Sequence, residues 1–563
     1  MNILGIGGYS HDSAAALVCD GQLVAAVAEE RLTRIKHQGG VPRRAVQFCL
    51  DTAGISIDDI DHVCCYMRPG LRLGKRIPYR LTQILKSPTY SAGYIAYEMQ
   101  HNAEYVLGMR GLCGRRAALH FMHHHPAHAA SAFLVSPFEE AALLSIDYVG
   151  EWDVTWAGVG RGTTITPLFS EHYPNSLGVL YTGLTDYLGF ARASDEYKVM
   201  GLASYGEPEY ADEFRRIVQL LPGGRYRIDL SWLQCHYLAG SRCGYMSPKF
   251  IQRFGAARKK DEPIGRKHQN IAASLQCVLE ETALHVARHL HDATKSKRLC
   301  LAGGVALNCS MNGRLLREGP FDEIFVQPAA GDDGIAIGAA LQKHYELTRA
   351  PRGFEMRHAF WGPEHSHESI KRFLDLAKLP YEHPANVIER TADLLVEGRI
   401  VGWYQGRMEF GPRALGARSI LADPTRADMK DLINMYVKHR EEFRPFAPSC
   451  LAERAGEYFD GCTSSPFMLF VYPVKKELRE KVPAITHVDG TARVQTVTRD
   501  ANPKYYALIE AFERRRGVPM VLNTSFNVMG EPIVNTPADA ARCFFSTGMD
   551  ALVLGDFVLT KSP

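Results

Sequence analysis

Ile-Leu-Gly-Ile-Gly-Gly at residues 3–8 is the stretch that decides the fold. Its apolar residues predict a short buried strand, and its paired glycines predict a tight loop at the end of that strand. A hairpin should follow, because the apolar runs 15–18 and 23–28 flank an Asp-Gly turn. The chain therefore opens with a strand, a glycine loop and a hairpin.

The same unit recurs later in the chain. Residues 143–147 predict a strand, residues 148–150 a loop, and the runs 154–159 and 165–169 flank a Gly-Arg-Gly turn. A duplicated unit of this kind is typical of two similar lobes, as in the actin and sugar-kinase superfamily. We therefore expect an actin-like α/β domain. Chance repetition of short glycine turns is the alternative.

The segment between the repeated units is less regular. Val41-Pro42 predicts the start of an amphipathic helix that ends at Gly54. Residues 66–115 are rich in Arg, Tyr and Pro and show no clear period. We expect them to form an irregular insertion that contacts a substrate.

Length and charge limit the classes of function. The 563 residues, 46% of them apolar, are too many for one ordinary core and predict two domains. A formal net charge of +3 predicts no nucleic-acid and no membrane partner. The 13 cysteines include no Cys-x-x-Cys pair, which argues against disulfides and zinc knuckles. With no signal peptide or long apolar run, we expect a soluble, cytoplasmic protein.

Four histidines lie within residues 123–128. His124 and His128 are four residues apart, so they would project from one helical face toward a single ion. Asp147 ends a predicted strand, and Asp332 lies in a glycine-framed loop with Asp333. Two histidines with aspartates from separate loops suit Fe²⁺, Mn²⁺ or Zn²⁺. The alternative is a polar patch that caps a helix, since a helix should begin near a proline at residue 126.

Glycine loops after strands predict a nucleotide site. Gly303 and Gly304 would let the backbone approach a base or phosphate, and Asn308 can hydrogen-bond a ribose or purine edge. The loop 331–334 should open a helix, whose N-terminus favours phosphate. Packing alone is the alternative for these glycines. Lys198, which follows an acidic residue, by itself favours a structural salt bridge.

A second composition begins after a linker at 347–364, which is rich in Pro and Gly. Arginines on several glycine-rich loops indicate a site for a highly anionic ligand, because guanidinium groups bind phosphate oxygens in pairs. A solvated basic face is the alternative. Hydroxyl and amide side chains at a strand end can also bind phosphate. The residues concerned are Arg407, Arg413, Arg418, Lys438, Arg440, Arg444, Arg493, Ser525 and Asn527.

Seven motifs in this order resemble the O-carbamoyltransferases of the NodU/CmcH type. They are His-His-Pro-Ala-His-Ala at 124–129 and the stretches 198–206, 302–308, 411–419, 443–449, 491–497 and 523–527. The resemblance covers nearly the whole chain. It implies an actin-like (ASKHA), Kae1-like domain at 1–352 and an α/β YrdC-like domain at 353–563. The YrdC-like domain would form carbamoyl-adenylate from carbamoyl phosphate and Mg²⁺-bound ATP, and the Kae1-like domain would transfer the carbamoyl group to an acceptor hydroxyl.

The resemblance also implies residue roles. His124, His128, Asp147 and Asp332 would bind the metal, with iron as first choice, and the adjacent Asp333 leaves the register of the last ligand open. Lys438, Arg444 and Arg493 would hold carbamoyl phosphate, and Arg413, Arg418, Ser525 and Asn527 would face ATP. From the glycine loops described above, rather than from the resemblance, we expect Gly303, Gly304 and Asn308, together with Lys198, to contact the nucleotide in the first domain. His11 or Asp12 would accept the hydroxyl proton, or else serve as a hydrogen-bonding neighbour of the site.

The implied acceptor is a sugar, aminoglycoside, polyketide or similar natural product, as in antibiotic biosynthesis, and the protein would be a monomer or homodimer. Two other functions are compatible with an actin-like fold. One is a small-molecule kinase, because fold does not determine chemistry. The other is a non-catalytic scaffold that binds nucleotide.

Overall fold

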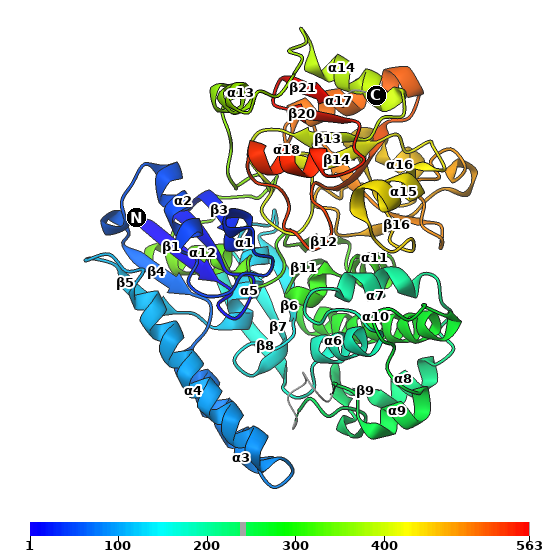
Figure 1. Ribbon diagram of the computed structural model, residues 1–563. Helices are drawn as coiled ribbons and strands as arrows, with labels where there is room; N and C mark the ends of the chain where they lie inside the picture. The colour runs from blue at the N-terminus through cyan, green and yellow to red at the C-terminus, as the bar shows by residue number, and fades with distance from the viewer. Residues whose placement is uncertain (237–243, 562–563) are drawn as a thin grey trace. The chain divides into compact units, whose positions relative to one another are not determined.

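The computed structural model describes residues 1–236 and 244–561 and divides into two compact units (Figure 1). The first unit comprises Met1–Glu29 and His37–Glu355. The second comprises Glu30–Lys36 and Met356–Pro563. Both are mixed α/β structures. Within the described residues the cysteines are all free, and no helix is long and apolar enough to cross a membrane.

The first sheet of the first unit is built on the opening strand. Its order is β3-β2-β1-β4-β5, with the hairpin antiparallel to β1 on one side and two parallel strands on the other. The strands are β1 (Asn2–Gly7), β2 (Ala14–Cys19), β3 (Gln22–Ala28), β4 (His62–Cys65) and β5 (Ala118–Phe121). The predicted strand and hairpin are confirmed.

The second sheet repeats this topology. Its order is β12-β11-β6-β7-β8, again with an antiparallel hairpin on one side of the leading strand and parallel strands on the other. The strands are β6 (Glu140–Ile146), β7 (Asp153–Arg161), β8 (Thr164–His172), β11 (Arg298–Ala302) and β12 (Glu323–Val326). The duplication predicted from the glycine loops is therefore present.

Two helices connect the repeats to the candidate site. α5 (His124–Phe133) packs against α12 (Ile335–Thr348), and the approach is close at Gly338. A Cβ at Gly338 would lie 2.0 Å from the Ala127 carbonyl oxygen, so only glycine fits without moving one helix.

The predicted helix before Gly54 is also confirmed, as α2 (Arg43–Ala53) with Gly54 in the left-handed region.

The prediction of an irregular insertion at 66–115 is wrong. This segment forms two helices, α3 (Pro69–Thr82) and α4 (Pro88–Arg110), which pack on each other and project from the first unit (Figure 1). The residues that these helices bury are mostly polar: Arg72 and Arg80 in α3, and Ser91, Glu98, His101, Asn102, Tyr105 and Met109 in α4. A search for apolar periodicity therefore missed these helices.

The first unit contains further elements. They are α6 (Leu177–Tyr187), α7 (Glu196–Ala203), α8 (Ala211–Ile217), β9 (Val218–Leu221), β10 (Arg225–Ile228), α9 (Pro248–Phe254), α10 (Arg266–Thr294) and α11 (Cys309–Glu318).

The second unit is built on a seven-stranded sheet of order β18-β15-β19-β14-β13-β20-β21. Its strands are β13 (Val401–Tyr404), β14 (Arg418–Ala422), β15 (Ala447–Leu451), β18 (Gln495–Val497), β19 (Met520–Ser525), β20 (Ala551–Leu554) and β21 (Phe557–Thr560), beside the pair β16 (Val471–Pro473) and β17 (Thr491–Arg493). Its helices are α13 (His367–Leu376), α14 (Val387–Val396), α15 (Met429–Leu432), η4 (Ile433–Lys438), α16 (Ala455–Tyr458), α17 (Pro503–Arg516) and α18 (Pro537–Phe545). The YrdC-like character of this unit stays a prediction.

A short segment from early in the chain completes the second unit. Residues 30–36 lie mostly in and just after α1 (Glu29–Thr33). Arg31 Nη2 donates to the Gly411 carbonyl oxygen at 3.0 Å, and Arg34 Nη2 donates to that of Pro532 at 2.8 Å. The second unit is therefore not continuous in sequence.

Candidate functional site

The histidine stretch forms the first turn of α5. His124 is the first residue of the helix, and His128 follows one turn later, with ring centroids 4.7 Å apart. Both side chains are buried. As predicted, the two imidazoles project from one helical face.

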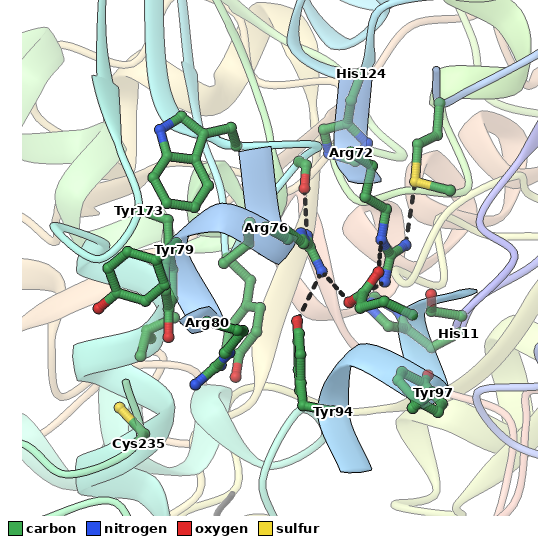
Figure 2. A pocket seen from close by; sticks show the side chains of 18 of the residues that line it. His11, Arg72, Arg76, Tyr79, Arg80, Tyr94, Tyr97, His124, Tyr173 and Cys235 are labelled. Carbon is green, nitrogen blue, oxygen red and sulfur yellow. Dashed lines mark hydrogen bonds and ion pairs between the residues drawn. The ribbon is translucent and has the colours of Figure 1, made fainter. Parts of the chain in front are cut away.

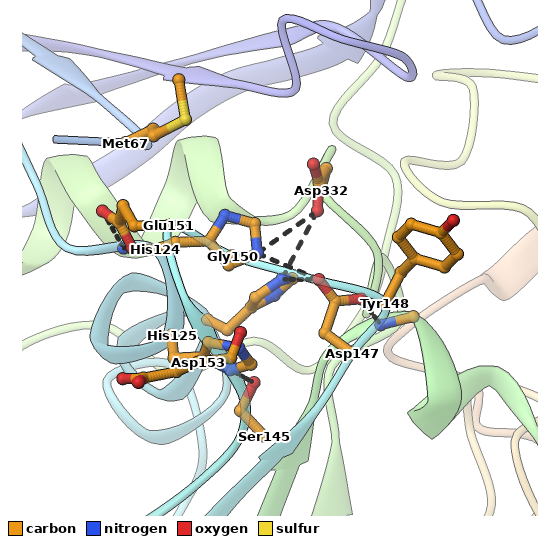
Figure 3. A network of polar contacts seen from close by, with 12 residues as sticks. Met67, His124, His125, Ser145, Asp147, Tyr148, Gly150, Glu151, Asp153 and Asp332 are labelled. Carbon is orange, nitrogen blue, oxygen red and sulfur yellow. Dashed lines mark hydrogen bonds and ion pairs between the residues drawn. The ribbon is translucent and has the colours of Figure 1, made fainter. Parts of the chain in front are cut away.

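Two aspartates from separate loops meet these imidazoles (Figure 3). His124 Nε2 lies 3.0 Å from Asp147 Oδ2 and 3.7 Å from Asp332 Oδ1. His128 Nε2 lies 3.7 and 3.5 Å from the same two oxygens. Asp147 directly follows β6, and Asp332 lies just before α12. It is Asp332 that reaches the cluster, whereas Asp333 accepts the Gly334 amide at 3.1 Å.

This donor set fits a divalent metal ion. One ligand atom from each of the four residues lies within 4.8 Å of every other. Both ring nitrogens of His128 are buried and have no hydrogen-bond partner within the described residues. Such nitrogens are costly unless they bind something. Two imidazoles and two carboxylates suit Fe²⁺, Mn²⁺ or Zn²⁺.

Neighbouring groups hold the cluster in position. The Gly304 amide donates to Asp147 Oδ1 at 2.8 Å, and the His124 amide donates to Glu151 Oε1 at 3.2 Å. Burial is the main cause that lowers the pKa of His125, to about 3, so this ring is neutral. Its nitrogens lie 2.9 Å from Ser145 Oγ and 2.9 Å from the Asp153 carbonyl oxygen. These contacts fix the first turn of α5 against β6.

His11 and Asp12 lie together near the cluster. His11 Nδ1 is 3.0 Å from Asp12 Oδ2, and His37 Nδ1 is 2.8 Å from Asp12 Oδ1. Burial alone would lower the pKa of His11, but the contact with Asp12 and the charge of Asp332 raise it to about 10. Both histidines keep the pKa of Asp12 well below its usual range, although burial opposes them.

A cavity of about 300 Å³ opens beside the cluster (Figure 2). His11, His124 and Asp332 line it together with residues of α3 and α4. Sequence reasoning did not identify the individual residues of this wall, although it placed substrate contact in their segment. Two spacings could have done so. Arginines recur at residues 72, 76 and 80, and aromatic rings at 90, 94, 97, 101 and 105.

The residues expected to contact nucleotide in the first unit have structural partners. Lys198 Nζ lies 3.1 Å from Asp195 Oδ2, so it forms a salt bridge with an acid just before the stretch from which one was inferred. Asn308 caps α11 by accepting the Met311 amide at 3.0 Å, and its Nδ2 donates to Gln276. Gly303 has a φ of 89° and sits against β6. Their role in nucleotide binding stays a prediction.

In the second unit, Lys438 comes together with Ser525 and Asn527. Lys438 Nζ donates to the carbonyl oxygen and Oδ1 of Asn527, both at 2.9 Å, and to Ser525 Oγ at 3.3 Å. The lysine is 3% exposed, and burial, followed by the nearby Arg440 and Arg444, holds its pKa well below the usual range. These three residues were expected to serve two different substrates, yet they form one group.

The arginines of the second unit differ in their environment. Arg418 is fully buried, lies 3.6 Å from the Tyr404 ring centroid and donates to the Gln405 carbonyl oxygen at 2.8 Å. A phosphate would have to displace such backbone contacts. Arg444 Nη1 lies 3.6 Å from a Glu441 oxygen and retains 14% side-chain exposure. Arg413 and Arg493, the latter at the end of β17, are half-buried.

Family profiles and related proteins match this chain along most of its length. The Carbamoyltransferase N-terminus profile matches residues 2–341, and the Carbamoyltransferase C-terminus profile matches residues 392–561. Nodulation protein NolNO of Sinorhizobium fredii is 43% identical over 567 residues, covering 98% of this chain and 79% of that protein. The 3'-hydroxymethylcephem-O-carbamoyltransferase of Amycolatopsis lactamdurans is 32% identical over 381 residues, covering 65% of each.

Among solved structures, component A of the (R)-2-hydroxyglutaryl-CoA dehydratase of Acidaminococcus fermentans aligns with 62% of this chain and 98% of its own, at 15% identity and a TM-score of 0.36. The two sequence profiles together match well over half of the chain, in the expected order. The chain belongs to the carbamoyltransferase family.

Proposed function

We propose that the protein is an ATP-dependent O-carbamoyltransferase that works in two half-reactions. The second unit would form carbamoyl-adenylate, and the first would pass the carbamoyl group to a hydroxyl of a small natural product. The observation that carries the proposal is the buried cluster of two histidines and two aspartates beside a cavity large enough for a small acceptor. Family membership and the O-carbamoyltransferase among the relatives support it.

In the first half-reaction, water would release phosphate from carbamoyl phosphate and leave carbamate. A carbamate oxygen would then attack the α-phosphorus of ATP, the bond to the β-phosphate would break, and pyrophosphate would leave. Negative charge accumulates on the departing groups. Lys438, Arg444 and Arg493 would hold carbamoyl phosphate, and Arg413, Arg418, Ser525 and Asn527 would face the Mg²⁺-bound ATP.

In the second half-reaction, the acceptor oxygen would attack the carbamoyl carbon. The bond from that carbon to the phosphate oxygen would break, and AMP would leave. One member of the His11–Asp12 pair would accept the hydroxyl proton, and the other would orient it. A divalent ion held by His124, His128, Asp147 and Asp332 would polarise that phosphate, and iron is our first choice.

The test is to incubate the full-length protein with ATP, Mg²⁺ and carbamoyl phosphate and to identify the products. We expect pyrophosphate, released only when carbamoyl phosphate is present. ADP as the product would instead indicate a kinase, and nucleotide binding without turnover would indicate a scaffold. Either result would rule out the proposed first half-reaction.

A further inference from the structure

Aromatic side chains form much of the cavity beside the metal cluster. The rings of Tyr79, Trp152 and Tyr173 lie edge to face, with centroids 5.4 to 5.7 Å apart. Tyr90 and Tyr94 of α4 add two more rings to the lining. Such walls bind flat or ring-shaped molecules well, and they also lower the local dielectric, which strengthens any charge interaction inside the cavity.

Three arginines of α3 reach this cavity, and two of them share one carboxylate as ion-pair partner. Arg72 Nε donates to Glu98 Oε2 at 2.7 Å, and Arg76 Nη1 donates to Glu98 Oε1 at 3.0 Å. Arg76 Nη2 also donates to the Gly150 carbonyl oxygen at 2.6 Å. The Glu98 side chain is 1% exposed. Arg72 and Arg76 are thus fixed in the wall by one buried carboxylate.

Arg80, one turn further along α3, is different. It is 4% exposed, and no carboxylate forms an ion pair with it anywhere in residues 1–236 or 244–561. Its Nη1 donates to the His236 carbonyl oxygen at 2.7 Å. Its guanidinium carbon lies 4.1 Å from the Tyr94 ring centroid and 5.2 Å from that of Tyr90. The other polar groups near this guanidinium are hydroxyls of tyrosines, which are neutral at pH 7, so an anion in the cavity would be its first partner of opposite charge.

Arg80 and the metal cluster line different parts of the same cavity. In Figure 2, Arg80 and Cys235 lie on one side of the view, whereas His11 and His124 lie on the other. A molecule that filled the cavity would contact both ends. Arginine binds planar or tetrahedral oxyanions through paired N–H groups, a geometry that lysine cannot match.

We propose that the acceptor carries an oxyanion, such as a carboxylate, sulfate or phosphate monoester, which pairs with Arg80 while the acceptor's hydroxyl faces the His124–Asp332 end of the cavity. This inference rests on the proposed function only in identifying the bound molecule as the acceptor of the carbamoyl group. The binding site itself does not depend on it. The aromatic rings between the two ends would hold the body of the acceptor and set the distance from oxyanion to hydroxyl.

The test measures binding of a matched pair of probes, 4-(hydroxymethyl)benzoate and 4-(hydroxymethyl)benzamide, to the full-length protein by calorimetry. Neither ATP nor carbamoyl phosphate is added, so the result is independent of turnover. We expect the carboxylate to bind the wild type about ten- to a hundredfold more tightly than the amide, the value of one charge-assisted contact. Arg80→Gln should abolish this preference, and Arg80→Lys should retain part of it.

Lys75→Gln is the matched control, because Lys75 is an exposed cation on the same helix and does not line the cavity. It should keep the full preference. Equal binding of the two probes, no binding of the carboxylate at millimolar concentration, or a preference that survives Arg80→Gln would each overturn the inference. Lys75→Gln should also leave carbamoyl-phosphate-dependent pyrophosphate release unchanged. A wild type that prefers the carboxylate but releases no pyrophosphate would reject the proposed function alone.

Discussion

Loss of one histidine should uncouple the stability of the first unit from divalent metal. The variant is His128→Ala, which removes a fully buried imidazole whose two nitrogens have no hydrogen-bond partner within the described residues. In the wild type, an ion at a free concentration of one hundred times its Kd should stabilise the folded first unit by about 2.7 kcal/mol. The variant should lose most of this stabilisation, because only three ligands remain.

The size of the first unit converts this free energy into a temperature. Unfolding entropy is about 2.1 cal/mol/K per residue, so the roughly 350 residues of the first unit give about 0.7 kcal/mol/K. The expected rise in Tm is therefore about 4 °C. Differential scanning calorimetry of chelator-treated protein, with Mn²⁺, Zn²⁺ or anaerobic Fe²⁺ added back, would measure it.

The control is His291→Ala, which removes a histidine of α10 that is not part of the cluster. It should keep the metal-dependent rise in Tm. Two results would refute the reasoning: a wild type that gains no stability from any of the three ions, or a rise of equal size in the wild type and in His128→Ala.

Two further predictions concern cationic and acidic side chains. Arg444→Ala should reduce pyrophosphate release about ten- to a hundredfold, because a charge-assisted contact to an ionised substrate contributes about 1.5–3 kcal/mol. The control Arg542→Ala changes a side chain that is 57% exposed and should leave the rate unchanged. An unchanged rate in Arg444→Ala would contradict the proposed role of Arg444. Glu98→Gln should lower the free energy of unfolding by about 3–5 kcal/mol at pH 7, because it leaves buried Arg72 without its carboxylate. Burial opposes ionisation of Glu98, but Arg72 and Arg76 lower its pKa from 4.5 to about 2. The difference in unfolding free energy between the wild type and Glu98→Gln should therefore shrink as the pH falls from 4.5 to about 2. A difference in urea unfolding that does not change with pH would contradict this prediction.

Local signals were enough to predict the repeat and the meeting of two histidines with two aspartates. An Asp-Gly turn between apolar runs specifies a hairpin by itself, and both predicted hairpins are present. His124 and His128 could be placed on one face because the helical period relates residues four apart. Asp147 was recognisable as the end of an apolar strand. The choice between Asp332 and Asp333 could not be made, because it depends on the path of one loop.

Features that depend on contacts distant in sequence escaped prediction. Lys438 meets Ser525 and Asn527 only because the turn that ends at Lys438 lies beside the end of β19, and nothing in either segment indicates the other. The cavity wall was missed for a different reason. Tyrosine and arginine can bury most of their surface while keeping a polar tip exposed. A pattern search that counts only aliphatic residues therefore does not detect a buried helix face made of them.

Residues 30–36 impose an order on the assembly of the second unit. They leave the ribosome early, yet the carbonyl oxygens that receive Arg31 and Arg34 belong to Gly411 and Pro532, which are made hundreds of residues later. Until those carbonyl groups are synthesised, Arg31 and Arg34 lack these hydrogen-bond partners, so the first unit either folds without these contacts or folds later. A fragment that begins after the linker would lack both arginines. If the two halves were expressed separately, residues 30–36 of the N-terminal half would have to bind the C-terminal half to complete the second unit.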